Sequence, residues 1–192
     1  MGVSRQQAAE NRNAIVAAAE RLFRARGVEA VGLAELMKEA GFTQGGFYNH
    51  FRSKDALVAA VMEKAMQDYG DSPNAGSLEK QAARYLSASH RDNIEAGCPL
   101  SGFAGDAPRM TDAARATYAH GLAVYLDRLA SMIATDGATA EQTRREAIAT
   151  LSQMVGALVL SRAIAGADPA FADEILEAGR RTLVDETPPA AP

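Results

Sequence analysis

The sequence predicts an all-helical fold, and three of its features indicate this. Apolar residues repeat at helical spacing through most of the chain, as Ile15, Ala19, Leu22 and Phe23 do at i, i+4, i+7 and i+8. Segments that alternate between apolar and polar residues over the length of a strand do not occur. Capping residues and helix-stopping glycines, such as Gly27, stand at the ends of the periodic segments.

Four helices are expected in the first 70 residues. Gly27 and Gly41 act as stops for the first two, and Thr43 and Ser53 can cap the third and fourth. The expected ranges are Glu10–Arg26, Leu33–Ala40, a very short helix after Thr43 to about His50, and a helix after Ser53 to about Tyr69. The turn formers of residues 71–77 then predict a break between two parts of the chain.

The rest of the chain is also expected to be helical. Thr139 and Gln142 fit a capping box, and Asp168 followed by Pro169 fits a helix start. The four turn-forming Gly and Pro residues between Gly97 and Arg109 predict only short, broken helices there. The expected long helices are Leu78–Ile94, Asp112–Ala134, Glu141–Ala165 and Pro169–Val184.

Composition limits the class of protein. The 192 residues are 47% hydrophobic and carry a formal net charge of −4. Residues 1–55 carry eight Lys and Arg against six Asp and Glu, so the negative charge lies in the remainder. The single cysteine, Cys98, excludes an internal disulfide and a cysteine-based zinc cluster. Without a secretory signal or a run approaching about 18 apolar residues, the chain is expected to be cytoplasmic, with no membrane partner.

An enzyme is not expected from the sequence. It has no nucleotide-binding loop, no Gly-x-Ser-x-Gly motif and no pair of histidines at metal-ligand spacing. Neither a cofactor nor a metal is therefore predicted.

Residues 33–54 form the most informative stretch. Two short amphipathic helices separated by residues 40–43 predict a helix-turn-helix, with Gly41 at the turn. The first turn of the second helix holds Gln44, Gly45 and Gly46. Exposed glycines destabilise a helix by about 1 kcal/mol each relative to alanine, so packing alone does not account for them. A helix end that must approach base edges or phosphates would benefit from them.

The residues after these glycines divide between core and surface. Phe47 and Phe51 are four residues apart and are expected in the core, which leaves Tyr48 and His50 to point elsewhere. Both have a polar tip able to donate to a phosphate oxygen. Lys54 lies in the first turn of the next helix, where its charge and the free backbone N–H groups favour an anion. An ordinary helical corner with surface Tyr48 and His50 is the alternative.

Residues 41–57, GFTQGGFYNHFRSKDAL, resemble the signature of the TetR (tetracycline-repressor-like) family of transcriptional regulators. The similar features are the glycine at the turn, the short glycine-containing helix, Tyr48-x-x-Phe51, and a Ser53-Lys54-Asp55 helix start. The close resemblance covers roughly residues 14–61. Gly32 and Met37 depart from it, because the family often has Ser or Thr at the first position and a small Ala at the second.

The resemblance implies an N-terminal three-helix helix-turn-helix DNA-binding domain and a C-terminal helical ligand-binding and dimerisation domain. The expected divisions are residues 1–55 for DNA binding, 56–186 for effector binding and dimerisation, and 187–192 for a flexible tail. Thr43, Gln44 and Gly46 would approach the major groove, and Tyr48, His50 and Lys54 would hold phosphates. The expected function is a repressor released from a palindromic operator by an effector. The last two helices would form a homodimer, although composition equally allows them to be the core of one monomer.

A small apolar or aromatic effector is the expected ligand of the C-terminal part. The residues that would line its pocket are mostly aromatic, and each is individually more typical of a core. They are Tyr69, Tyr85, Cys98, Phe103, Met110, Tyr118, Tyr125 and Met132.

Two alternatives to this interpretation stay open. Cys98 in Gly97-Cys98-Pro99-Leu100 allows a regulator that responds to oxidants or electrophiles, since a similar stretch occurs in some branches of the family. A buried Cys98 acting as a small hydrophobe is the plainer interpretation. The nearly neutral N-terminal region and Gly32 also allow a helical interaction module that does not bind DNA.

Overall fold

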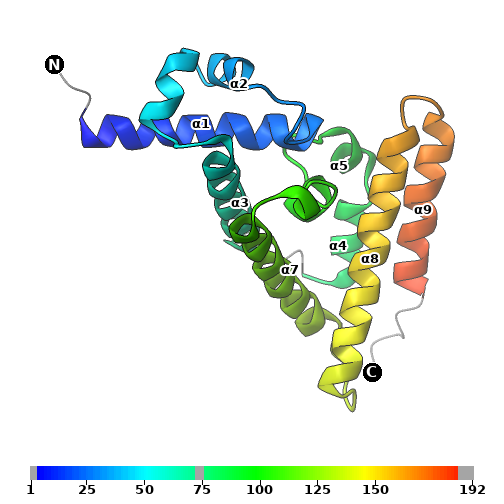
Figure 1. Cartoon of the computed structure of the whole chain (residues 1–192). Coiled ribbons are helices and arrows are strands. Elements are labelled where there is room, and N and C mark those ends of the chain that lie inside the picture. The colour runs from blue at the N-terminus through cyan, green and yellow to red at the C-terminus, as the bar shows by residue number, and fades with distance from the viewer. Residues whose placement is uncertain (1–3, 72–75, 186–192) are drawn as a thin grey trace. The chain divides into compact units, whose positions relative to one another are not determined.

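The computed structural model describes residues 4–71 and 76–185, and within them it contains helices and no strand, as the sequence predicted (Figure 1). The chain divides into two compact units. Unit 1 is the described part of Met1–Asp71 together with Ile94–Gly121, and unit 2 is the described part of Ser72–Asn93 together with Leu122–Pro192.

Unit 1 contains the predicted helix-turn-helix. Its helices are α1 (Arg5–Arg26), α2 (Leu33–Glu39), the 3-10 helix η1 (Gln44–Asn49), α3 (Lys54–Asp71), α6 (Pro99–Gly102) and the 3-10 helix η2 (Ala107–Arg109). Helix α7 (Asp112–Ile133) begins in unit 1 and ends in unit 2. The other helices of unit 2 are α4 (Leu78–Tyr85), α5 (Ala88–Asp92), α8 (Ala140–Ile164) and α9 (Pro169–Asp185).

The core of unit 1 forms where α1 packs against α2 and α3. Helix α1 starts earlier than the sequence predicted, because the Ser4 hydroxyl accepts a hydrogen bond from the Gln7 amide and caps it. It stops at Gly27 as predicted, with φ at 82°. Phe23, Leu36 and Met62 are among the fully buried side chains that join the three helices.

The predicted helix Leu78–Ile94 is wrong, because two shorter helices take its place. Leu86 leaves the helical conformation with φ −95° and ψ 50°. The Ser87 hydroxyl then accepts from the His90 amide at 3.1 Å and starts α5. A side chain that can cap a new helix competes with continuation of the old one.

Unit 2 is built around the pairing of α8 with α9, which lie side by side in Figure 1. The predicted capping box at Thr139 and Gln142 is present, with both of its hydrogen bonds. The Asp168 carboxylate accepts from the Phe171 amide at 3.0 Å, as predicted for the start of α9. A Cβ on Gly179 would lie 3.0 Å from the Cβ of Ala157, so this glycine permits the close approach of the two helices.

The predicted division at residue 55 separates the chain by function, whereas the compact units separate it by packing. The predicted division therefore stays a prediction. The turn cluster of residues 71–77 falls mostly outside the described residues, and so does the predicted tail of residues 187–192. Unit 1 ends its first segment at Asp71, where the sequence predicted a break.

Among the described helices, α8 has the length and composition of a membrane span, with 33% of its most apolar window buried. This is a weak indication, because core helices of water-soluble proteins have the same properties. The absence of a membrane partner stays a prediction.

Candidate nucleic-acid interface

The turn between α2 and η1 has the backbone geometry of a helix-turn-helix. Gly41 has φ at 83°, a conformation that residues with a Cβ rarely adopt. Its amide donates to the Lys38 carbonyl at 3.0 Å, and the Phe42 amide donates to the Met37 carbonyl at 2.8 Å. These bonds end α2 and direct the chain into η1, as the position of Gly41 in the sequence predicted.

The second helix of the motif is a 3-10 helix, and this changes the predicted role of Thr43. Thr43 stands at the N-cap position, but its side chain makes no capping hydrogen bond. The Gly46 amide instead donates to the backbone carbonyl of Thr43 at 3.0 Å, so the hydroxyl is not needed as a cap. Thr43 and Gln44 are therefore both exposed at the start of η1.

The two glycines of η1 differ in their surroundings. A Cβ on Gly45 would meet no atom within 4 Å, so intramolecular packing does not require glycine there. A Cβ on Gly46 would lie 3.8 Å from the Cε of Met37 and 3.9 Å from the Thr43 hydroxyl, which is ordinary contact. Met37, which departs from the family pattern, is fully buried and fills the space beside Gly46.

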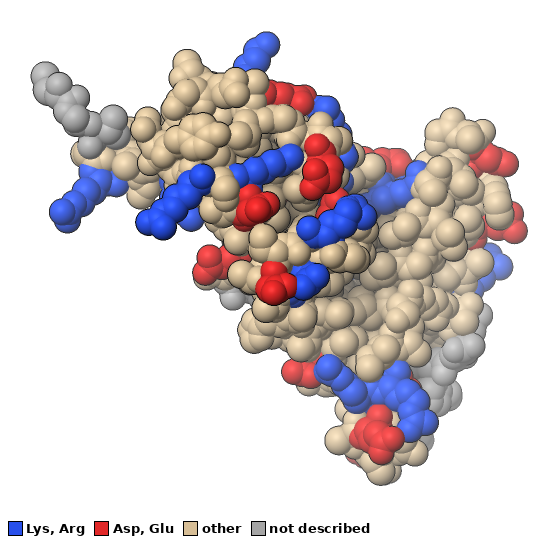
Figure 2. Space-filling view, in the orientation of Figure 1, with Lys and Arg blue, Asp and Glu red and all other residues tan. Residues whose placement is uncertain are grey.

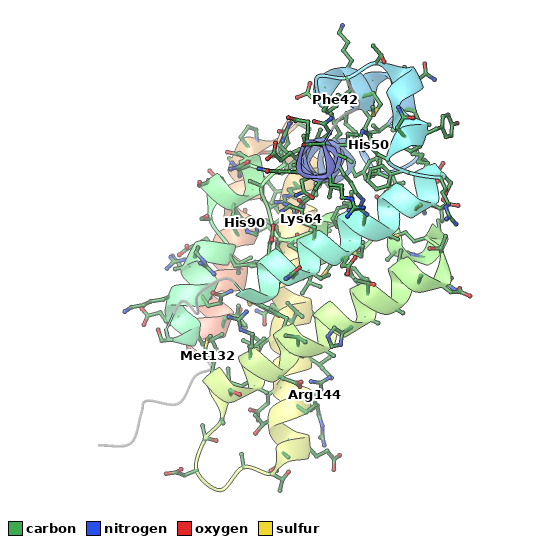
Figure 3. All side chains as sticks on the ribbon, turned by 90° about the vertical axis from the view of Figure 1, so that its left-hand side faces the viewer. Phe42, His50, Lys64, His90, Met132 and Arg144 are labelled. Carbon is green, nitrogen blue, oxygen red and sulfur yellow. The ribbon has the colours of Figure 1, made fainter. Side chains whose placement is uncertain are left out.

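Phe47 and Phe51 occupy the core as predicted, with 0% and 4% of their surface exposed and their rings stacked at 5.8 Å. Tyr48 is turned outward and is 69% exposed, with its ring edge-on to Phe47. His50 is half-buried, and its ring centroid lies 6.3 Å from that of Phe42 (Figure 3). The helix thus has a buried aromatic side and an exposed side that carries Thr43, Gln44 and Tyr48.

Lys54 begins α3, five residues after the last residue of η1. The Ser53 hydroxyl accepts from the Ala56 amide at 3.1 Å, which confirms the predicted cap. The Nζ atom of Lys54 lies 5.9 Å from the centre of the Phe23 ring, a cation–π distance. This contact holds the ammonium at the positive end of α3, where an anion would be favoured.

Arg12 is a candidate contact that sequence reasoning missed. It is exposed on α1, and its guanidinium carbon lies 4.8 Å from the centre of the Phe51 ring. Figure 2 shows Lys and Arg side chains along the surface around α1, toward the N-terminus. Among the described residues, neither Arg12 nor Lys54 forms a salt bridge, whereas Arg26 pairs with Glu35. The sequence contains no signal for this contact, because Arg12 and Phe51 are brought together only by packing.

The predicted pocket residues fall into two groups, and each group lies within one unit. In unit 1, Cys98 and Phe103 are buried, and the Tyr118 hydroxyl donates to the Leu100 carbonyl at 2.7 Å. Burial, with the thiol of Cys98 nearby, raises the pKa of Tyr118 to about 12. Unit 1 also holds Tyr69 and Met110.

In unit 2 the predicted pocket residues include Tyr85 and Tyr125. The Gln81 side-chain amide, which is buried, donates to the Tyr125 hydroxyl at 2.8 Å. The Tyr85 ring lies edge-on to His90 at 4.7 Å, and the Nδ1–H of His90 donates to the Tyr85 carbonyl at 2.7 Å. Met132 lies in this unit as well, half-buried on α7. The assignment of both groups to an effector pocket stays a prediction.

Cys98 stands at the N-cap position of α6 and is 5% exposed. Its carbonyl accepts from the Ser101 hydroxyl at 3.0 Å and from the Gly102 amide at 2.9 Å. The buried thiol matches the environment of a small hydrophobe more closely than that of a reactive cysteine.

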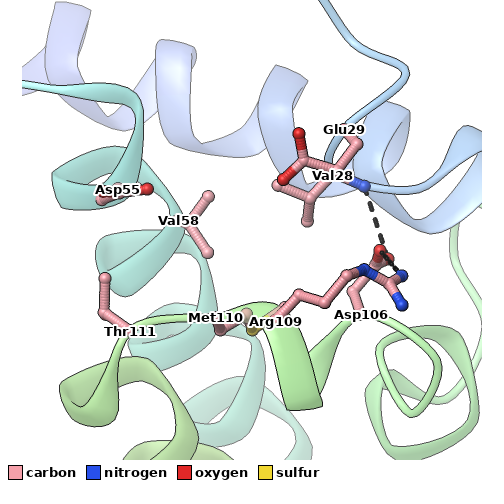
Figure 4. A pocket seen from close by; sticks show the side chains of 8 residues that line it. All are labelled: Val28, Glu29, Asp55, Val58, Asp106, Arg109, Met110 and Thr111. Atoms are coloured by element: carbon pink, nitrogen blue, oxygen red, sulfur yellow. Dashed lines mark hydrogen bonds and ion pairs between the residues drawn. The ribbon is translucent and has the colours of Figure 1, made fainter.

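Unit 1 has a small pocket beside the end of α1 (Figure 4). Within it the Asp106 carboxylate accepts from the Val28 amide at 3.4 Å and pairs with Arg109 at 3.1 Å. Met110 is the one predicted pocket residue among those that line it, which are Val28, Glu29, Asp55, Val58, Asp106, Arg109, Met110 and Thr111. The described residues contain no group of three or more His, Cys, Asp or Glu that would suit a metal ion.

The helical fold and the exposed motif place this chain in the class of helix-turn-helix proteins. Comparison with known proteins shows which family of that class it resembles. A family model described as bacterial regulatory proteins, tetR family, matches residues 15–61. The HTH-type transcriptional regulator TtgR of Pseudomonas putida is 35% identical over 78 residues, which are 41% of this chain and 37% of TtgR. The HTH-type transcriptional repressor NemR of Escherichia coli is 38% identical over 60 residues, 31% of this chain and 30% of NemR. The match thus spans about a third of the length of these relatives.

Solved structures extend the likeness to nearly the whole chain. A TetR transcriptional regulator from Chloroflexus aurantiacus matches with a TM-score of 0.74 at 18% identity, and the alignment covers 94% of this chain and 95% of that protein's chain. The reduced form of Escherichia coli NemR matches with a TM-score of 0.66 at 20% identity, and the alignment covers 94% of this chain and 100% of the NemR chain. Residues 15–61 of this chain thus match the tetR family model, and the chain has the fold of TetR-family regulators.

Proposed function

We propose that this protein is a DNA-binding transcriptional repressor. The observation that carries the proposal is the exposed side of η1, within the region that matches the tetR family model. There the Thr43 side chain makes no capping hydrogen bond, Gln44 is exposed, and a Cβ on Gly45 would meet no atom within 4 Å. The N-terminal residues of such a helix are the ones that meet base edges in the major groove. Gln44 is suited to the N6 and N7 groups of adenine.

Phosphate contacts would surround this readout. Tyr48, His50 and Lys54 would hold the backbone of the duplex, as the sequence predicted. Arg12 joins them in the proposal because it is exposed and lies over Phe51, at the end of η1. The division into a DNA-binding domain of residues 1–55 and an effector-binding and dimerisation domain of residues 56–186 belongs to the same proposal.

The protein would act as a homodimer through α8 and α9. Apart from Tyr48, the large apolar side chains that are exposed in the described part of the chain all lie on these two helices. They are Ile148, Val159, Leu160 and Phe171, with 46%, 43%, 59% and 51% exposed. Gly156 lies among them, and a Cβ there would meet nothing within 4 Å, so contacts within the chain do not account for it. A second copy covering this face would supply the two recognition helices that a palindromic operator requires.

A small apolar or aromatic effector would release the operator by binding one of two dimer geometries more tightly than the other. Tyr118 and Tyr125 support an apolar or aromatic ligand, since each side chain combines an apolar ring with a hydroxyl that forms a hydrogen bond.

Two experiments in sequence test the proposal. The purified protein first selects from a pool of random duplex DNA, and the enriched duplex is then titrated by fluorescence anisotropy at two salt concentrations. We expect a palindrome bound by a dimer, with affinity that falls steeply as salt rises. If no sequence is enriched, with or without reductant, the chain is an interaction module and the recognition-helix assignments are withdrawn. The same labelled duplex then serves to screen effectors.

A further inference from the structure

Helix α7 contains a glycine in its interior that the DNA-binding motif does not explain. Gly121 lies nine residues after Asp112, the first residue of the helix. Alanine is favoured over glycine in the interior of a helix, so a glycine there needs another reason. It is also the last residue of the segment of α7 that belongs to unit 1.

The reason lies in the neighbouring helix α3. A Cβ built on Gly121 would lie 2.8 Å from the Cγ of Met66 and 3.0 Å from its Cβ, and closer still to its sulfur. Figure 3 shows the two helices next to each other. A different rotamer of Met66 could move the sulfur and the Cγ, but its Cβ moves only with the backbone of α3. A side chain at position 121 would therefore require both a new rotamer of Met66 and a shift of a few tenths of an ångström between the two helices.

This half of α7 is also fixed from a second direction. The hydroxyl of Tyr118, which lies three residues before Gly121, donates a hydrogen bond to the Leu100 carbonyl of α6. Ala114, one turn earlier on the same face, is fully buried. With α7 held in this way, the contact at Gly121 determines how far α3 can lie from it.

Helix α3 connects this contact with the proposed DNA-binding side. Met66 is buried, and the helix packs along α1 through buried residues such as Leu57 and Val61. Lys54 stands at its N-terminal end, twelve residues before Met66 or about 18 Å along a helix. A helix transmits a shift over this length because it moves largely as a rigid element.

We propose that Gly121 is a positioning residue for operator binding, because it receives Met66 and so fixes the place from which α3 presents Lys54. This inference rests on the proposed function, and it adds a determinant outside the DNA-binding motif.

The test compares Gly121→Ala with the control Gly105→Ala, a loop position where a Cβ would meet nothing within 4 Å. Titrations use the operator selected as described above and an unrelated duplex of the same length. We expect Gly121→Ala to weaken operator binding at least about tenfold and to weaken binding to the unrelated duplex as well, because Lys54 would hold a phosphate whatever the base sequence. The salt slope should fall by about one phosphate contact per subunit. Gly105→Ala should match the wild type on both.

The double variant Gly121→Ala/Met66→Ala separates positioning from general loss of stability. Removal of the Cγ and the sulfur takes away the two closer contacts and leaves only the Cβ contact at 3.0 Å, which a shift of a few tenths of an ångström relieves. Operator affinity should therefore return to within about threefold of the wild type. Operator binding by Gly121→Ala within twofold of the wild type, or no recovery in the double variant, would overturn the proposal.

Thermal melting without DNA keeps this inference separate from the proposed function. Overpacking should lower the melting temperature of Gly121→Ala by roughly 2–12 °C. A variant that melts at or above the wild type, as helix propensity alone would give, shows that the close contact does not exist. If the expected melting result is found but the wild type selects no DNA sequence, the proposed function fails, and with it the role of Gly121 in operator binding, while the packing contact stands.

Discussion

At the scale of single residues, Gln44 and Lys54 should have different effects on DNA binding. Gln44 is exposed at the start of η1, and Lys54 is held over the Phe23 ring at the start of α3. Gln44→Ala should relax the preference for the selected operator by about 1–3 kcal/mol at one base pair in each half-site. Lys54→Ala should weaken binding to all duplexes and reduce the salt slope by about one phosphate contact per subunit. Anisotropy titrations of matched and mismatched duplexes over a range of salt measure both effects, and wild-type behaviour of both variants would refute the assignment.

The reactivity of the Cys98 thiol should show whether this residue senses oxidants or only packs in the core. Because it is 5% exposed, reaction with a reagent in solution requires the chain around α6 to open first. We expect native Cys98 to react with a disulfide reagent such as DTNB on the order of 100-fold more slowly than in the unfolded chain. Reaction at close to the unfolded rate would favour the regulator that responds to oxidants. The Cys98→Ser variant then shows whether any oxidant response of DNA release depends on this thiol.

At the scale of elements, the sequence predicted most of the local caps, with Thr43 as an exception, and it predicted tertiary contacts poorly. The capping box at Thr139, the start of α9 at Asp168 and the turn at Gly41 depend on side chains or backbone conformations a few residues away, and all are present. The break at Leu86 was missed, although Ser87 is a residue that can cap a new helix. The position of Arg12 over Phe51 could not be predicted, because the two residues are far apart in the sequence and meet only through tertiary packing.

His90 in α5 should make unit 2 sensitive to acid. Burial, together with the nearby charges of Arg162 and Arg84, outweighs the hydrogen bond to Tyr85 and lowers the pKa of His90 below 6.5. A group whose pKa is lower in the folded chain than in the unfolded chain stabilises the fold above its unfolded pKa. This stabilisation is lost as the pH falls through the folded pKa. The melting temperature should therefore decrease as the pH is lowered from about 7 to below 6.

Substitution of His90 by Asn isolates this effect. The Asn side-chain amide can replace the Nδ1–H group that donates to the Tyr85 carbonyl, but it does not titrate. His90→Asn should flatten the decrease in melting temperature with pH, whereas His120→Asn, at an exposed position of α7, should leave it as in the wild type. An unchanged pH profile in His90→Asn would assign the acid sensitivity to another group.

At the scale of the whole molecule, DNA binding and dimerisation should be linked, because a palindrome requires two recognition helices in one particle. The exposed face of α8 and α9 contains Val159 and Phe171, and a charge buried there without a partner is strongly unfavourable. Val159→Glu and Phe171→Glu should each raise the dissociation constant of the dimer at least about 30-fold, the effect of losing about 2 kcal/mol. Ala116→Glu, at an exposed position of α7, is the matched control and should have no effect.

Sedimentation velocity over a range of protein concentrations measures the dimer, and titration of the full palindrome and of a single half-site measures the linkage. Variants that dissociate should lose affinity for the palindrome but keep the weak affinity of the wild type for a half-site, because η1 and Lys54 lie in unit 1 and are unchanged. If Val159→Glu and Phe171→Glu remain dimeric and bind the palindrome as the wild type does, the two copies associate through another surface. Loss of half-site binding as well would instead mean that the substitutions disturb the fold of the DNA-binding region, which the melting curves of the same variants would reveal.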